Sequence, residues 1–333
     1  MIDGPRVRRG VAASFLIFAA AAASAQPTTG LRLASDVWPP FTDEPGGRRV
    51  AIELVEAALE RVEVEVGTEI RSDFGQVMSG IRAGELDGSA ALWRNQERES
   101  FLVFSRPYLE NRLVLLARKG TEVSAASLAA VGLKRIGIVE SYAYGDALDK
   151  ASGPIFIEGP SDQENLQRLL RGAVDYILAD ELLIHDLFER NARAEVLLEA
   201  GATPMLERSL HFGIRRDLAG SQAIVDRFDA AIREMIADGT YNQILGVVWI
   251  RADVDGDGES ELVLGGEQAG SSAPDDGYSV FRREPAGVEG DRKAPYVVGG
   301  EKYESWNQIP PSYRVPVTRE SRDRGPGYPL FTF

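Results

Sequence analysis

Strands that alternate with helices over residues 31–250 predict an α/β protein with mostly parallel sheets. Apolar runs of strand length recur between segments whose apolar residues return every three or four positions. The same order of elements restarts near residue 133. After Trp249 the chain becomes rich in Gly, Pro and acidic residues, which predicts a small irregular C-terminal appendage.

The first part of this region contains three expected strands and two expected helices. Ile52, Val55 and Leu59 share one helical face, and Gly84 follows the second periodic segment, where a left-handed cap is expected. The strands are expected at residues 31–34, 62–66 and 113–117, and the helices at 50–61 and 74–83.

The second part repeats this alternation. Ile224, Phe228 and Ile232 keep helical spacing in a long last helix that Gly239 ends. The strands are expected at residues 135–139, 155–157, 174–178 and 210–214, and the helices at 142–150, 162–170, 181–189 and 218–237. In the appendage, short strands are expected at 262–264 and 296–298, followed by a poorly structured or docking tail over 299–333.

The N-terminus carries the pattern of a secretory signal. Three arginines among residues 6–9 precede an apolar run over 11–23, and Ala23, Ser24 and Ala25 form the small-residue site that a signal peptidase accepts. The run is shorter than the roughly 20 residues that cross a bilayer. Residues 1–25 are therefore predicted to be removed, which gives a periplasmic or secreted protein.

Composition excludes several classes of function. The chain has no cysteine, so disulfides, thiol catalysis and cysteine-bound metals are excluded. A formal net charge of −14, with no basic run after the first ten residues, argues against a nucleic-acid partner. His185 and His211 show no metal-ligand spacing, and the absence of a Gly-rich phosphate loop predicts no nucleotide cofactor.

Several ordered segments resemble the bacterial extracellular solute-binding proteins of family 3, which include the polar amino-acid receptors of ABC transporters. The matching segments are GELD at 84–87, ERE at 97–99, FSRPY at 104–108, RIGIVESY at 135–142, GAVDYILADE at 172–181 and the closing helix at 228–244. The resemblance implies a periplasmic-binding-protein-like fold, in which two lobes joined by a two-stranded hinge close on a ligand. Lobe 1 is expected at 31–117 and 207–250, lobe 2 at 118–206, and an acidic extension at 251–333.

Arg98 stands where this family places the arginine that binds the ligand carboxylate. Its planar guanidinium suits a carboxylate because it donates two parallel hydrogen bonds; an ion pair with Glu97 or Glu99 is the structural alternative. Asp180 matches the family position that accepts a ligand ammonium, and a helix N-cap is its alternative. Ser141 and Tyr142 are expected to begin a helix, where free backbone N–H groups favour an anion or serve ordinary capping.

Aromatic residues complete the expected ligand-binding set. Trp38 and Phe41 lie in the loop after the first strand, where the family places a ring that stacks on the ligand; a lid over the core is the alternative. The segment before Arg98 departs from the family pattern: it is one residue shorter, Asn95 replaces the usual Thr, and Trp93 adds bulk. This departure argues against a standard amino acid as the ligand and leaves a related organic acid or amine open; the overall expectation is an amino acid or a related compound.

An acidic loop in the extension carries a second chemical signal. Oxygen donors at alternate positions, with Gly at the sixth, match the start of a calcium loop. The expected ligands are Asp253, Asp255, Asp257, Glu259 through its carbonyl, and Glu261. Leu264 stands where an EF-hand has its Glu, so the pattern is nearer to short Asp-rich β-type loops, and an acidic turn without metal is the alternative.

These observations predict a monomeric solute-binding protein that captures a small carboxylate-bearing molecule, with a membrane permease as partner and no enzymatic activity. A periplasmic enzyme of the same fold, similar to cyclohexadienyl dehydratase, is one alternative, with Glu140 as a general acid at the edge of the cleft. A signalling or cell-envelope binding module is the other. Fold alone does not separate these functions.

Overall fold

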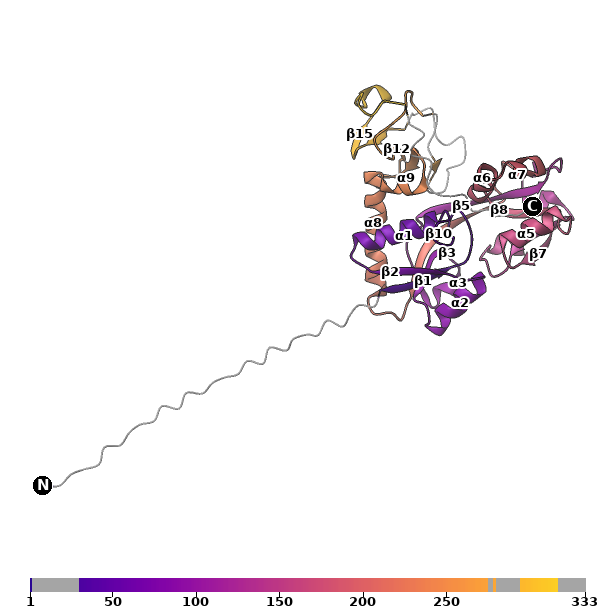
Figure 1. Ribbon diagram of the computed structural model, residues 1–333, viewed down its shortest axis with the longest axis horizontal. Helices are drawn as coiled ribbons and strands as arrows, with labels where there is room; N and C mark the ends of the chain where they lie inside the picture. Colours follow the sequence, from indigo (N-terminus) through magenta and orange to yellow (C-terminus); the bar gives the residue numbers. More distant parts are fainter. Residues whose placement is uncertain (2–29, 275–277, 280–293, 317–333) are drawn as a thin grey trace.

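The computed structural model describes residue 1 and residues 30–274, 278–279 and 294–316 (Figure 1). Two α/β lobes lie side by side, and a small β-module lies at the top of Figure 1, beside the end of the helix α8. The predicted signal segment and residues 317–333 of the expected tail lie outside the described residues.

Lobe 1 is built on parallel strands whose faces are covered by amphipathic helices. The strand β1 pairs in parallel with β2 and β3, and the apolar faces of the helices bury residues such as Ile52 and Phe228. Its elements are β1 (Leu31–Ser35), α1 (Val50–Arg61), β2 (Val66–Ile70), α2 (Phe74–Ala83), β3 (Gly88–Trp93), α3 (Gln96–Glu99), β4 (Leu102–Phe104), α8 (Ser221–Asp238) and α9 (Thr240–Leu245).

Two long strands, β5 (Leu109–Arg118) and β10 (Leu206–Arg215), join the lobes. They pair antiparallel between Leu109–Leu113 and Leu206–Leu210. The strand β10 then pairs with β3 and β4 of lobe 1, and β5 pairs with β8 and β9 of lobe 2. One hydrogen-bonded sheet of ten strands therefore runs through both lobes, and the expected two-stranded hinge is its central part.

Lobe 2 repeats the layered arrangement on a smaller scale. The strand β6 pairs in parallel with β7 and β8, and the helices α5 and α6 pack against them. Its elements are a 3₁₀ turn (Leu128–Val131), β6 (Arg135–Val139), α4 (Asp146–Asp149), β7 (Ile155–Gly159), α5 (Asp162–Leu170), β8 (Tyr176–Asp180), α6 (Glu181–Arg190), α7 (Ala192–Leu197) and β9 (Leu198–Ala200).

The C-terminal module is a five-stranded sheet with an apolar core of its own, in which Trp249, Tyr296 and Trp306 pack edge to face or tilted against one another. The strands expected at 262–264 and 296–298 are confirmed within it. Its elements are β11 (Trp249–Ala252), β12 (Glu261–Leu264), β13 (Tyr278–Ser279), β14 (Tyr296–Val298), β15 (Glu301–Tyr303) and a 3₁₀ turn (Trp306–Gln308).

The module is fastened to lobe 1 through α9. The amide of Asn242, which is fully buried, donates to the carbonyl of Val263 at 2.8 Å. Gly265 packs so closely on this residue that a Cβ there would lie 2.1 Å from the Asn242 Cβ. Only glycine fits at this point of contact.

Three sequence expectations about local structure were wrong. The strand expected at 62–66 lies at 66–70, because the N–H groups of Val62, Glu63 and Val64 turn back to close the end of α1. The helix expected at 142–150 is confined to Asp146–Asp149. The strand expected at 174–178 lies two residues later, so that Asp180 is its last residue.

Candidate functional site between the lobes

Arg98 lies buried between the lobes, with 4% of its surface exposed. The helix α3 holds it in place, because the side chain of Asn95 caps that helix by accepting the Arg98 N–H at 2.8 Å. The guanidinium donates to the carbonyl of Trp93 at 2.6 Å and, across the lobes, to the carbonyl of Ser141 at 2.8 Å. Burial lowers the pKa of Arg98 to about 10, so the group stays charged at neutral pH.

Aromatic rings surround this guanidinium. Arg98 lies 4.9 Å from the centre of the Phe74 ring, a cation–π distance. Trp38 and Trp93 meet edge to face at 5.7 Å, and Tyr142 of lobe 2 lies edge to face against both and against Phe74. The site therefore combines a fixed positive charge with flat apolar walls, as the capture of a small polar anion requires.

Tyr142 closes this site from lobe 2. Its hydroxyl donates to the carboxylate of Asp36 in lobe 1 at 3.1 Å, and its ring fills the space between the lobe-1 rings. The remaining cavity measures only 20 Å³, little more than the roughly 10–15 Å³ that a single water needs. A ligand of amino-acid size therefore enters only when Tyr142 moves out.

The left-handed backbone of Ser141 decides which of its polar groups the lobe-2 wall presents to Arg98. Ser141 has φ 65°, a conformation that L-residues other than glycine rarely adopt. Its carbonyl, not its N–H, faces Arg98, and α4 begins only at Asp146. The expectation that Ser141 and Tyr142 open a helix whose N–H groups meet an anion is therefore wrong for this conformation.

The structure brings four of the predicted ligand-binding residues to one cavity: Trp38, Trp93, Arg98 and Tyr142. The other four do not line this cavity. Phe41 is fully buried behind Trp38, with ring centres 4.4 Å apart, Asn95 caps α3, Ser141 contributes its carbonyl, and Asp180 caps α6 by accepting the N–H of Leu182 at 2.7 Å. Their roles toward a ligand stay predictions.

The sequence analysis did not assign a ligand role to Asp36, Phe74, Ala91 and Ala143, which also line this cavity. Asp36 lies just after the strand expected at 31–34, and Phe74 begins the helix expected at 74–83. Asp36 is 6% exposed, and burial raises its pKa to about 6, although the hydroxyl of Tyr142 opposes that rise. A polar residue at the carboxyl end of a parallel strand was the available signal.

Trp93 of the aromatic wall is bonded to Asn111 of the hinge strand β5, and Asp180 lies at the end of the neighbouring strand β8. The indole N–H of Trp93 donates to the Asn111 carbonyl oxygen at 2.8 Å. Asp180 is 2% exposed, its Oδ2 is buried without a hydrogen-bond partner, and burial raises its pKa to about 7. The capping role of this residue is confirmed, and its expected role toward a ligand ammonium is not tested by this contact.

A second cavity, of 150 Å³, lies between the lobes and shares Asp36 with the first. Lobe 1 contributes Asp36 and Ser72, and lobe 2 contributes Asp162 and Asp186. Burial raises the pKa of Asp162 to about 7, and the charges of Asp36 and Asp180 add to that rise. The two cavities therefore differ in charge: the first is lined by Arg98, rings and one carboxylate, that of Asp36, and the second by three carboxylates.

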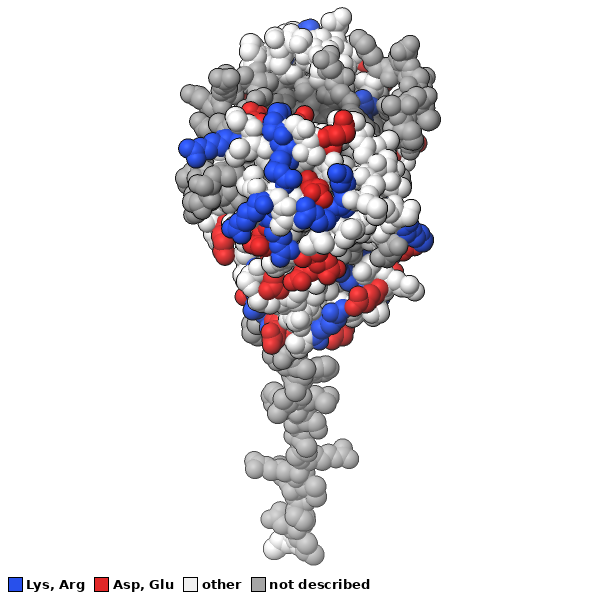
Figure 2. Space-filling view, turned by 90° about the vertical axis from the view of Figure 1, so that its right-hand side faces the viewer, with Lys and Arg blue, Asp and Glu red and all other residues white. Residues whose placement is uncertain are grey.

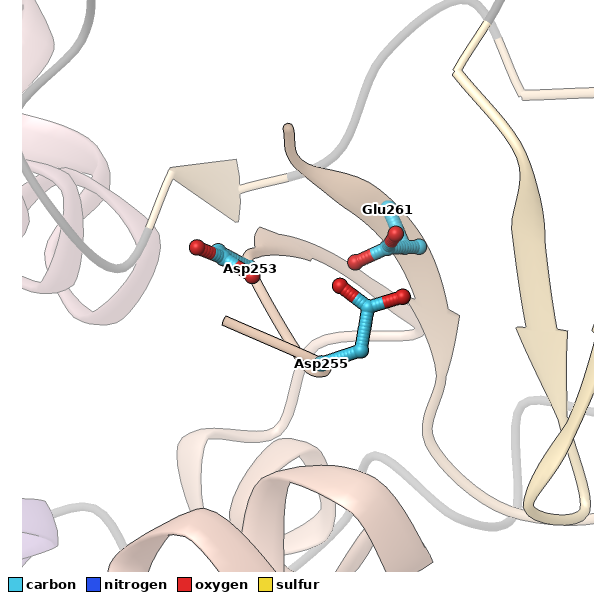
Figure 3. Close-up of side chains that lie close together, drawn as sticks. All are labelled: Asp253, Asp255 and Glu261. Carbon is cyan, nitrogen blue, oxygen red and sulfur yellow. The ribbon is translucent and has the colours of Figure 1, made fainter. Parts of the chain in front are cut away.

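The acidic loop of the C-terminal module brings together three of its five expected metal ligands. The carboxylates of Asp253, Asp255 and Glu261 converge, with one oxygen of each within 4.8 Å of the others (Figure 3). Asp257 lies outside this group and accepts the N–H of Glu259 at 2.7 Å. Oxygen donors of this kind suit calcium. The binding of calcium by this loop stays a prediction.

The ammonium group of a lysine already neutralises part of the negative charge of this loop. The Lys302 ammonium donates to Glu261 Oε1 at 2.7 Å and to Asp255 Oδ2 at 2.9 Å. Both bonds raise the pKa of Lys302 above its ordinary value. A calcium ion that binds here has to displace this ammonium.

Surface charge gives no sign of a dedicated nucleic-acid surface on the face that Figure 2 shows. Acidic and basic side chains are interspersed there, and no large patch of one sign appears. Among the described residues, no helix is long and apolar enough to cross a membrane.

The two-lobed fold and the site between the lobes indicate a solute-binding protein, and comparison with known proteins agrees. The family model of bacterial extracellular solute-binding proteins, family 3, matches residues 31–247. The chain belongs to this family, as the resemblance in its sequence predicted.

Individual relatives are distant. The chain is 22% identical over 194 residues to the ABC transporter glutamine-binding protein of Bacillus subtilis, covering 56% of this chain and 68% of the relative. It is 23% identical over 216 residues to the ABC transporter arginine-binding protein 1 of Escherichia coli, covering 63% and 86%. A stretch of 44 residues is 46% identical to part of a virulence sensor protein of Bordetella pertussis. It covers 13% of this chain and 4% of that protein.

Solved structures show the same fold. An ancestral arginine-binding protein bound to arginine superimposes with a TM-score of 0.56 at 23% identity, covering 65% of this chain and 96% of that one. Nearly all of that protein but only about two thirds of this chain is matched. The C-terminal module is therefore consistent with an addition to the common fold.

Proposed function

We propose that this protein is an extracytoplasmic solute-binding protein that captures a small carboxylate-bearing ligand, an amino acid or a related compound, for ABC-type transport. The observation that carries the proposal is the buried Arg98 guanidinium, held by α3 between the lobes and walled by Trp38, Phe74 and Trp93. Family membership and the names of the two transporter relatives support it. Cleavage after Ala25 and delivery to a membrane permease by a monomer belong to the same proposal.

Capture then consists of an exchange of partners at Arg98. In the closed structure its guanidinium bonds the carbonyls of Trp93 and Ser141. A ligand carboxylate is the stronger acceptor because it is charged and matches the two-pronged donor. The ligand therefore replaces the Ser141 carbonyl and the Tyr142 ring, and binding shifts the lobes only as far as its affinity differs between the two conformations.

Thermal melting with a panel of amino acids, organic acids and amines tests this function. A ligand at 100 times its Kd stabilises the folded protein by about 2.7 kcal/mol. We expect one class of carboxylate to raise the Tm, and Arg98→Ala to abolish the rise. Arg94→Ala is the control, since that exposed arginine pairs with Glu99 outside the cavity. A ligand that stabilises the Arg98→Ala variant as much as the parent contradicts the proposed role.

Sensing is the second candidate function, because a short stretch matches a virulence sensor protein. The same ligand test applies, and the readout that separates the two is whether a permease or a sensor partner binds the loaded form. The enzymatic alternative relied on Glu140, which is exposed and lines neither cavity between the lobes.

A further inference from the structure

A third cavity lies along the hinge strand β10, and none of its described lining residues belongs to either cavity between the lobes. Its volume of 630 Å³ falls within the roughly 300–1,000 Å³ of sites that hold small organic molecules. Residues 204–209 supply most of its wall, and Arg94 of lobe 1 and Glu110 of β5 add to it. The cavity is therefore large enough for a ligand and separate from the Arg98 site.

Arg208 brings to this cavity a positive charge without a carboxylate partner in the described part of the chain. Its Nη2 donates to the carbonyl of Arg94 at 3.3 Å, and its Nε is buried and donates no hydrogen bond. Burial also lowers the pKa of Arg208, because the charged group has lost part of its hydration. A guanidinium in this state favours an anion that accepts its unused hydrogen bonds.

The other charged groups of the cavity are engaged or lie on the other face of the hinge sheet. The guanidinium of Arg94 forms an ion pair with a glutamate of α3. Glu110 is the cross-strand partner of Ser209 and accepts its hydroxyl at 3.0 Å. Because side chains alternate along a strand, Glu207 and Ser209 lie on the face of β10 opposite to Arg208. The face that carries Arg208 therefore favours negative charge.

Apolar side chains in the same wall decide between an inorganic and an organic anion. Pro204, Met205 and Leu206 line the cavity together with Arg208. Phosphate or sulfate gains nothing from apolar surface. A carboxylate on an alkyl chain uses both kinds of wall, because its oxygens accept two parallel hydrogen bonds from the guanidinium and its methylenes pack on the apolar side chains.

Arg208 also lies where the two lobes approach the hinge. Its Nη2 bonds lobe 1 through Arg94, and a Cβ on Gly145 of lobe 2 would come within 3.1 Å of its Nη1. Its guanidinium lies 6.0 Å from the ring centre of Trp93, which lines the Arg98 cavity. An occupant bonded to Arg208 therefore contacts the point at which the hinge, both lobes and the aromatic wall meet.

We propose that the hinge cavity binds a small organic anion, a carboxylate on an alkyl body, at Arg208. This site is distinct from Arg98, and the inference does not depend on which solute the lobes capture. The carboxylate takes up the hydrogen bonds that Arg208 leaves unused, and the alkyl body covers Met205 and Leu206. Binding favours the lobe arrangement in which these groups lie together.

Isothermal titration of the full chain with hexanoate and hexanamide tests this, because the two probes share a shape and differ in charge. We expect hexanoate to bind at least tenfold more tightly than hexanamide. Arg208→Gln should abolish that difference, and Arg208→Lys, which keeps the charge without the planar fork, should retain part of it. Arg168→Gln is the control and should change nothing, since Arg168 pairs with Glu164 outside this cavity.

Crystals of the full chain soaked with 6-bromohexanoate locate the site without any variant. Anomalous density for bromine in the hinge cavity supports the inference, even where no solute of the wider panel binds at Arg98. Bromine only between the lobes, with hexanoate affinity lost in Arg98→Ala and kept in Arg208→Gln, overturns the inference and leaves the proposed function standing. Equal binding of hexanoate and hexanamide, or no binding of either, also overturns it.

Discussion

Two groups of three carboxylates lie in different parts of this molecule, and they differ in how their negative charge is compensated by the chain. In the C-terminal module, the Lys302 ammonium donates hydrogen bonds to Glu261 and Asp255 and neutralises part of their negative charge. Between the lobes, Asp162 keeps a buried oxygen without a hydrogen-bond partner, beside Asp36. Lys302 therefore bonds two members of the first group, whereas in the second group Arg48 pairs with Asp186 and the Asp162 oxygen keeps no partner.

Removal of the lysine should have the largest effect. Lys302→Met leaves Glu261, which is 1% exposed, without its ammonium donor, and an orphaned buried acceptor is costly. We expect the Tm to fall by about 6 °C in calcium-free buffer. Calorimetry with added calcium should restore much of that loss, because the ion then takes the place of the ammonium.

Lys119→Met is the matched control, since Lys119 forms an exposed ion pair with Glu199. Its Tm should change little, and calcium should not alter it. An equal calcium response from the parent protein and Lys302→Met would show that the ammonium and the ion do not compete.

Neutralising a carboxylate between the lobes should change the Tm in the opposite direction. Asp162→Asn should raise the Tm of the ligand-free protein by about 3 °C at pH 8, because it removes a buried charge that has no partner. Differential scanning fluorimetry from pH 5 to pH 8 measures the effect. A lower Tm at pH 8 would mean that the chain itself already compensates this charge.

The dependence on pH follows from the raised pKa of Asp162. Its folded value of about 7 exceeds the unfolded value near 3.9, so the folded state holds the proton more tightly. The associated stability is present below pH 4 and is lost as the pH rises through about 7. Asp162→Asn should therefore flatten the decline between pH 5 and 8. The ionisable groups that act on Asp162 or lie with it around the cavity are Asp36, Asp180, Asp186, Arg48, Tyr142 and Tyr144.

The hydrogen bond that crosses between the cavities should have a smaller effect. Tyr142→Phe removes the donor to Asp36 at a cost of about 1 kcal/mol, or about 2 °C in Tm. It should also raise the pKa of Asp36 further, since that bond now opposes the effect of burial. Tyr144→Phe is the control, because its hydroxyl accepts the Val139 N–H within lobe 2. A drop in Tm without any change in pH dependence would contradict the link to Asp36.

The smallest effect is expected at Asp257, which lies outside the group of three carboxylates in the module. Asp257→Asn keeps an oxygen that accepts the Glu259 N–H, so the Tm in calcium-free buffer should change by less than about 1 °C. A weaker calcium response in this variant would show that the ion recruits Asp257, as the sequence spacing predicts.

The contrast between these groups also shows what a sequence reveals about charge. Asp253, Asp255 and Glu261 lie within nine consecutive residues, so their spacing alone predicts that they converge. Asp36, Asp162 and Asp186 come from the end of β1, the start of α5 and the middle of α6. Only the closed arrangement of two lobes brings them together, and no local pattern carries that information.

Local periodicity predicted the α/β alternation and the helices α1, α2 and α5 closely, because amphipathic faces repeat within a few residues. It missed β3, in which all six residues are buried and no alternation exists. It also failed around Ser141, where a left-handed residue turns the chain before α4. The family resemblance was enough to predict the place of Arg98. That the Tyr142 ring fills the site between the lobes could be seen only in the structure.

The attachment of the module through Asn242 and Gly265 has a practical consequence. Because the module is packed on lobe 1, a change in the angle between the lobes would move its tip relative to lobe 2 by more than it moves residues near the hinge. A fluorescent donor at exposed Glu301 and an acceptor at Leu133, which is 84% exposed in lobe 2, would convert solute capture into a change in energy-transfer efficiency. Without engineering of either cavity, the chain thus already has the layout of an optical biosensor.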